Sequence, residues 1–161
     1  MTESPIEADF LHALKTVCGT RCIVLDGATV KEVRIRAHNE ETGQCIFIGP
    51  QVWVGKYRAD FILGAYYRAT YPLLLAVECD GKEFHSTAPQ MMRDRERDSF
   101  FGSQGLKVKR FSGKQIMRDP YKCAKQAVEI VRPYQPIARG FRTLGGITLT
   151  DRSKAMAGDG A

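Results

Sequence analysis

Two acidic residues close an otherwise apolar stretch of the chain, residues 73–80, and this stretch constrains the fold more than any other. It reads LLLAVECD, and its length and composition predict a buried β-strand. Side chains two positions apart share a face of a strand, so Glu78 and Asp80 point together while Val77 faces the core. A buried strand tolerates charge only where a positive group meets it, and we therefore expect a polar site at this end of the strand.

A second apolar run, YRADFIL at residues 57–63, carries a single acid, Asp60. A short connection between the two runs would pair them as antiparallel neighbours and bring Asp60 toward Glu78 and Asp80. Three carboxylates at strand ends are hard oxygen ligands of the kind that Mg²⁺ or Mn²⁺ binds. Such an ion lowers the pKa of a bound water and offsets the charge that builds on a phosphodiester during attack. The alternative is that each acid forms an ordinary ion pair at a strand end, with Arg58, Lys82 or Arg93.

The size and composition of the chain favour a single soluble domain. It has 161 residues, of which 43% are apolar and 26% are charged, as in ordinary globular domains. No stretch approaches the roughly 20 apolar residues of a membrane span, and the N-terminus MTESPIEADF lacks the basic and apolar regions of a secretory signal, so we expect a cytoplasmic protein. The five cysteines, an odd and scattered set, predict reduced thiols.

Apolar periodicity and turn residues predict the order helix, strands, helix, strand, helix. Ser4, Pro5 and Glu7 have the positions of a helix N-cap, first residue and capping-box acid, and the helix is expected to reach Val17. Glycine and proline at 49–50 are expected to separate short strands of an antiparallel meander. The other predicted elements are strands at 22–25, 44–48, 52–54, 57–63, 73–80 and 106–111, and helices at 89–104 and 114–131, the last interrupted near Asp119 and Pro120.

The composition changes after Pro133 to glycine, proline, threonine, alanine and serine. We therefore expect residues 1–132 to form one α/β domain and residues 133–161 to be a partly flexible C-terminal tail. Within the tail, residues 141–150 have the pattern of a hairpin that would dock on the domain or on a partner.

Positive charge is concentrated in one part of the chain. The net charge is +6, divided as −2 for residues 1–92, +6 for residues 93–132 and +2 for the remainder. A local excess of lysine and arginine favours a polyanionic partner such as nucleic acid, although solvated basic faces also occur in proteins that bind none. The expected phosphate contacts are Lys107, Lys109, Arg110 and Lys114, with Arg110 on the opposite face of its strand from Lys107 and Lys109.

The segments YRADFIL, AVECDGKEFHS and RDRERDSFFGSQGLKVKRFSGKQI together resemble a known family. It is the group of small bacterial proteins related to the very-short-patch-repair (Vsr-like) endonuclease, within the PD-(D/E)XK restriction-endonuclease-like superfamily, and the resemblance covers about residues 4–118. It implies an α/β fold with a restriction-endonuclease-like core, in which helices flank a mixed central β-sheet.

The resemblance also implies roles for the acids. Asp60 corresponds to the first acid of the family motif and to a metal ligand, and Glu78 to the second acid, a ligand or water activator. Asp80 stands where many superfamily members have lysine, a departure that this subfamily shares and that leaves the identity of the general base open. Glu7 matches an acid that approaches the metal through water, although a plain capping glutamate explains it equally well.

Two further features follow from the same resemblance. His85 lies near the position of a catalytic histidine and could accept a proton from the activated water; the alternative is a histidine hydrogen-bonded within its loop. Asp94, Arg97 and Asp98 belong to the family pattern and are expected to support the acidic site, whereas their alternating signs would otherwise indicate a solvated helix face.

The function expected from these residues is metal-dependent hydrolysis of DNA phosphodiesters, with Mg²⁺ as cofactor and Mn²⁺ able to replace it. The setting would be repair, restriction and defence, or mobile elements, and a homodimer or a protein partner bound through the tail is compatible with it. Two alternatives remain: a catalytically silent nucleic-acid-binding module within a larger complex, and a nuclease directed at RNA. The pattern does not distinguish single-stranded from double-stranded targets.

Overall fold

Five strands form one mixed sheet in the computed structural model, which describes residues 2, 4–40, 45–66, 73–80 and 87–132. The tail and His85 lie outside the described residues. The strands are β1 (Cys22–Val24), β2 (Ile46–Val54), β3 (Tyr57–Ala65), β4 (Leu73–Asp80) and β5 (Leu106–Ser112). The helices are α1 (Pro5–Cys18), the 3-10 turn η1 (Gly19–Arg21), α2 (Val30–His38), α3 (Ala88–Ser103), α4 (Gly113–Arg118) and α5 (Pro120–Val131).

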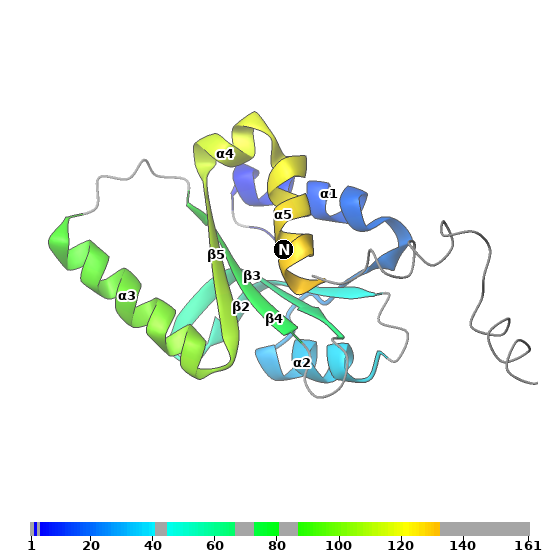
Figure 1. Cartoon of the computed structure of the whole chain (residues 1–161), viewed down its shortest axis with the longest axis horizontal. Coiled ribbons are helices and arrows are strands. Elements are labelled where there is room, and N and C mark those ends of the chain that lie inside the picture. The colour runs from blue at the N-terminus through cyan, green and yellow to red at the C-terminus, as the bar shows by residue number, and fades with distance from the viewer. Residues whose placement is uncertain (1, 3, 41–44, 67–72, 81–86, 133–161) are drawn as a thin grey trace, which may run out of the picture. The chain divides into compact units, whose positions relative to one another are not determined.

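The strands lie side by side in chain order, β1 to β5. The three central strands form the expected antiparallel meander, while β1 runs parallel to β2 and β5 runs parallel to β4. Helices cover both faces of this sheet, with α1, α4 and α5 on one side and α2 on the other (Figure 1). The α/β class and the mixed sheet flanked by helices are therefore confirmed.

Each face of the sheet has its own hydrophobic core. The first core joins α1, α4 and α5 to the sheet and is centred on three aromatic residues, Phe10, Phe61 and Phe111. The ring of Phe10 lies 5.4 Å from that of Phe61 and 5.6 Å from that of Phe111, measured between centroids. The second core joins α2 and α3 to the opposite face, where Val33 and Phe101 are fully buried. The acidic residues at the end of β4 thus lie in a sheet that helices cover on both faces.

The predicted break at Gly49 and Pro50 is wrong, because β2 continues through both residues. The strand bends instead at Gln51, whose φ of 52° is the one positive value among the described residues other than glycine. On either side of this bend the pairing with β3 keeps its register, from Pro50 opposite Phe61 to Val52 opposite Ala59. The bend therefore changes which side chains face each core without interrupting the strand, and it places Gln51 across from Asp60.

Helix α2 is the element that apolar periodicity does not predict. Thr29 and Glu32 form a complete capping box at its start, with the Thr29 amide donating to Glu32 Oε2 over 2.6 Å and the Glu32 amide donating to Thr29 Oγ1 over 3.2 Å. Only Val33 and Ala37 of this nine-residue helix are buried, so its apolar stripe is too short to be recognised by spacing.

The turn between β2 and β3 depends on Gly55. Its φ of +59° is a left-handed conformation, and a Cβ atom at this position would lie 2.6 Å from Phe100 Cζ. We expect Gly55→Ala to lower the free energy of unfolding by about 1–3 kcal/mol, because alanine strains this backbone and displaces the Phe100 ring. Urea denaturation followed by circular dichroism measures the change.

Gly102 in α3 is the matched control for this substitution, because nothing lies within 4 Å of the position of its Cβ. Gly102→Ala is expected to leave stability unchanged or to raise it by up to about 1 kcal/mol. Equal destabilisation by both substitutions would contradict the role given to Gly55.

Within the described ranges, none of the helices combines the length and the apolar character that a membrane span requires.

Candidate functional site

Asp60 lies where β3 and β4 separate. The last paired residues of these strands at this end are Phe61 and Val77. Asp60, one residue before Phe61, is therefore the first residue of β3 beyond the paired stretch. Its Oδ2 atom accepts a hydrogen bond of 2.6 Å from the backbone amide of Cys79. The carboxylate therefore replaces the missing ladder contact and is held at the fork between the two strands.

Glu78 is buried in this fork and faces two arginines. Its residue is 3% exposed, and its Oε2 atom lies 3.0 Å from Arg97 Nη2 on α3. Arg110 is the residue directly opposite Glu78 on the parallel strand β5. The positive groups that a buried acid requires thus come from the charged helix and from the basic strand.

The acids of α3 engage Arg110 in turn. Arg110 Nη2 donates to Asp98 Oδ1 over 2.6 Å, and Arg110 Nη1 lies 4.0 Å from Asp94 Oδ2. The predicted residues Asp94, Arg97 and Asp98 therefore point from α3 toward β4 and β5. They form an alternating chain of charges that ends at Glu78.

Glu7 and Gln51 form a second polar pair near Asp60. Gln51 Nε2 donates to Glu7 Oε2 over 2.7 Å, and Glu7 is only 7% exposed. The Glu7 amide also donates a hydrogen bond to the N-cap hydroxyl oxygen of Ser4, so this glutamate belongs both to the helix start and to the site. Sequence reasoning missed Gln51, since the strand was expected to break just before it; the signal that could have found it is its place opposite Asp60 in a continuous hairpin.

Two buried oxygens at these positions have no hydrogen-bond partner within the described part of the chain, Glu78 Oε1 and Gln51 Oε1. Unsatisfied buried acceptors are rare and commonly mark a place for a water or an ion. Both belong to residues that flank Asp60 on neighbouring strands, and both are hard oxygen donors. The donor chemistry at this fork therefore fits a divalent cation such as Mg²⁺.

The pKa values of the acids reflect their burial. Burial raises the pKa of Glu78 to about 8, against the opposing effect of Arg97, and the charge of Asp60 adds to the rise. Burial also raises the pKa of Asp60, which the hydrogen bond from the Cys79 amide opposes and the nearby Glu7 charge reinforces. Burial thus favours the protonated form of both carboxyls at this fork.

The remaining predicted residues occupy several places. Asp80 ends β4, opposite Ser112, and its charge raises the pKa of both Asp60 and Glu78. Lys107 is exposed, and Lys109 lies with its Nζ 5.1 Å from the centre of the Phe111 ring, on the face of β5 away from Glu78. Lys114 lies in α4. Of the four basic residues, Arg110 is the one placed beside the acids.

The described residues contain no group of three histidine, cysteine or acidic side chains already arranged to hold a metal ion. Mg²⁺ commonly takes only one or two protein carboxylates and completes its shell with water and substrate phosphate. A site made by Asp60 and Glu78 would be of this kind.

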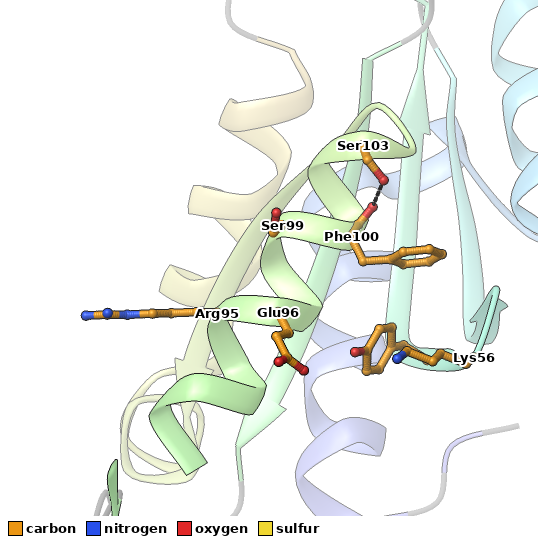
Figure 2. Close-up of a pocket in the computed structure, with 7 residues that line it drawn as sticks. Lys56, Arg95, Glu96, Ser99, Phe100 and Ser103 are labelled. Carbon is orange, nitrogen blue, oxygen red and sulfur yellow. Dashed lines mark hydrogen bonds between the residues drawn. The ribbon is translucent and has the colours of Figure 1, made fainter. Parts of the chain in front are cut away.

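An open hollow of about 720 Å³ lies on a different face of α3 from the one that contacts Glu78. Figure 2 shows Phe100 reaching from α3 toward the turn that carries Lys56. Arg95 and Glu96 line this hollow, whereas Arg97 and Asp98 contact the acidic site. The hollow is therefore separate from the acids.

The raised pKa of Glu78 makes stability depend on pH. The unfolded glutamate ionises near its ordinary value of 4.5, whereas the folded one ionises near 8, so between these values the native state binds the extra proton. We therefore expect the free energy of unfolding of the wild type in EDTA to fall, relative to Glu78→Gln, as pH rises from 5 to 8. The difference in slope is at most one proton, about 1.4 kcal/mol per pH unit.

Denaturant titrations at four pH values measure this difference. Glutamine keeps the size of the side chain and removes only its titration. Parallel stability curves for the two proteins would show that Glu78 carries no raised pKa.

Comparison with known proteins adds one match. The family model REase_MTES_1575, a restriction-endonuclease-like family, matches residues 23–131, which is more than half of the chain. The matched range contains Asp60, Glu78 and Asp80, while Glu7 precedes it. No curated protein and no solved structure matches the chain significantly.

Proposed function

The chain belongs to the restriction-endonuclease-like family REase_MTES_1575, and from that membership we propose that it is a metal-dependent nuclease that hydrolyses phosphodiester bonds in DNA. The family suggests a nuclease and therefore a nucleic-acid substrate. The assignment to DNA, to Mg²⁺ and to the Vsr-like branch of the PD-(D/E)XK superfamily is our proposal. It is supported by the order of the acidic, histidine and Arg-Asp motifs along the chain.

The observation that carries the proposal is the pair of carboxylates at the fork of β3 and β4. Asp60 is fixed there by the Cys79 amide, and Glu78 presents a buried oxygen that no described residue satisfies. A purely structural ion pair between Glu78 and Arg97 would leave this oxygen unexplained. Asp60 and Glu78 would hold the cation, with Asp80 assisting.

When bound, such a cation supplies a water of lowered pKa and offsets the charge that develops on the phosphodiester. The protein's own residues prepare the site. Asp60 is held by a backbone donor rather than by a mobile side chain, and Arg97 favours the ionised form of Glu78. Glu78 must release its proton before it can serve as a ligand, so cation binding and deprotonation are coupled.

His85 is proposed as the group that accepts the proton from the attacking water, and Lys107, Lys109 and Lys114 as contacts to phosphates away from the cut. Glu7 is proposed to reach the cation through water. These roles follow from the resemblance and from the charge of the residues.

A cleavage assay on labelled substrates tests the proposal. Duplex DNA, single-stranded DNA and RNA of one sequence are incubated with the full chain in Mg²⁺, Mn²⁺ or EDTA. Cleavage of DNA in either metal, absent in EDTA, is the expected result. Cleavage of RNA alone would show that the substrate is RNA and not DNA. Salt-sensitive binding without cleavage of any substrate would favour a silent binding module instead.

A further inference from the structure

The end of the β2–β3 hairpin separates from the β4–β5 pair of the sheet. The pairing of β3 with β4 stops at Phe61 opposite Val77, whereas the pairing of β2 with β3 continues to Val54 opposite Tyr57. The parallel pairing of β1 with β2 ends at Val24 opposite Ile48. In the described part of the chain, the end of this hairpin is therefore a two-stranded ribbon that pairs with no further strand on either side.

One face of this ribbon is covered by α3. Val52, Val54 and Ala59 belong to the second core, and the Tyr57 ring lies 5.5 Å from that of Phe100 and 6.2 Å from that of Phe101. Side chains alternate between the faces of a strand, so Trp53 and Arg58 point to the other face. The apolar face of the ribbon is thus already buried against α3.

The opposite face carries an exposed tryptophan. Trp53 is 63% exposed, the third most exposed of the large apolar residues that the structure describes, and it is the single tryptophan of the chain. Arg58, directly across the hairpin, places its guanidinium 5.6 Å from the centre of the Trp53 ring. The cation holds this ring in place while the surface of the ring stays in water, so the ring is available to stack on a ligand.

The pair adjoins the acidic site. Trp53 lies two residues from Gln51 and Arg58 lies two residues from Asp60, a separation of about 7 Å along each strand. Gln51 contacts Glu7 of α1, on the side of the sheet toward which Trp53 points. When one phosphate of a nucleic-acid strand lies at Asp60, the neighbouring nucleotide of that strand would therefore lie at Trp53 and Arg58.

We propose that Trp53 and Arg58 form a stacking platform for an unpaired base of the substrate strand, next to the phosphate at Asp60. An aromatic ring beside a cation stacks on any nucleobase and balances the charge of the adjoining phosphate. In a duplex the faces of the bases are covered by their neighbours, so the platform selects single-stranded or locally opened nucleic acid. This inference rests on the proposed function for its ligand class, DNA or RNA.

The fluorescence of Trp53 reports directly on the platform, because no other tryptophan contributes. The full chain in EDTA, where no cleavage occurs, is titrated with single-stranded oligothymidylate, single-stranded oligouridylate and a DNA duplex of equal length. We expect the single strands to quench the fluorescence at saturation and the duplex to bind more weakly with little quenching. Unchanged fluorescence while anisotropy of a labelled single strand shows binding would overturn the proposal.

Substitutions test the stacking contact independently. Trp53→Ala is expected to lower the affinity for a labelled single strand about tenfold to a hundredfold, and Trp53→Phe much less, because phenylalanine retains a ring. Tyr121→Ala, which removes an aromatic residue 45% exposed on α5, is the matched control and should bind as the wild type does. Circular dichroism verifies that each variant is folded, and equal binding by Trp53→Ala would refute the platform.

The outcome is separable from the nuclease assignment. Binding that depends on Trp53 in a protein that cleaves nothing in Mg²⁺ would reject the nuclease and keep the platform. Cleavage of single strands by Trp53→Ala with an unchanged KM would reject the platform and keep the nuclease. Absence of binding to every nucleic acid would reject both.

Discussion

Asp60→Asn is expected to lower the rate of nucleic-acid cleavage by a thousandfold or more while leaving the fold intact. The neutral amide loses the charge that a divalent cation requires, and metal-assisted stabilisation of a phosphodiester transition state is worth several kcal/mol, with about 1.4 kcal/mol for each factor of ten. The amide oxygen of asparagine can still accept the hydrogen bond from the Cys79 amide. Initial rates on the preferred substrate in Mg²⁺ measure the loss.

Asp119→Asn is the matched control for this substitution. Asp119 lies between α4 and α5, where its Oδ1 accepts a hydrogen bond of 2.9 Å from the Lys122 amide. Asparagine caps a helix as well as aspartate does, so cleavage and stability should both be retained. A fully active Asp60→Asn protein would reject Asp60 as a metal ligand, and equal losses in both variants would point to an unspecific effect of charge.

The second large effect is expected in the first core, where Phe10→Ala should lower the free energy of unfolding by about 3–5 kcal/mol. Phe10 is completely buried and contacts the rings of Phe61 on β3 and Phe111 on β5. Its removal leaves a cavity between α1 and the two strands that bracket β4. Urea denaturation at pH 7 measures the change, with the midpoint falling at an unchanged slope.

Met117→Ala provides the comparison, because Met117 on α4 is 74% exposed. Its replacement is expected to change stability by less than about 0.5 kcal/mol. A loss below about 1 kcal/mol for Phe10→Ala would show that α1 is not held on the sheet through this ring cluster.

Local patterns predict most of the elements that carry the site. The cap at Ser4, the apolar run of β4 and the glycine after α3 place α1, β4 and β5 within a few residues of their observed bounds. Helix α1 buries four residues and β4 buries six, so their spacing stands out from the surrounding sequence. Helix α2 buries only two side chains, and its capping box alone is too small a signal to distinguish it from a loop.

The strand β2 shows the opposite limit. Glycine and proline together normally end a strand. Strand β2 continues through them because of contacts with residues that are distant in the sequence. A Cβ at Gly49 would lie 2.8 Å from Val52 Cγ2 and 3.1 Å from Val33 Cγ2, so glycine here allows α2 to approach the sheet closely. This reason becomes visible only when helix and strand are placed together.

The sequence by itself determined the α/β class, the antiparallel order of the central strands and the presence of Asp60, Glu78 and Asp80 on adjacent strands, because burial patterns with periods of two and 3.6 residues are local. Only the tertiary structure decided that β3 and β4 separate at Asp60, that Gln51 lies opposite it, that Arg97 and Arg110 meet Glu78, and that Trp53 is left exposed beside them. These contacts join residues distant in sequence, and they depend on the bend in β2 and on how α3 packs across the sheet. The pKa of Glu78 follows from the same packing, since burial depends on what surrounds a carboxylate and not on its neighbours in the chain.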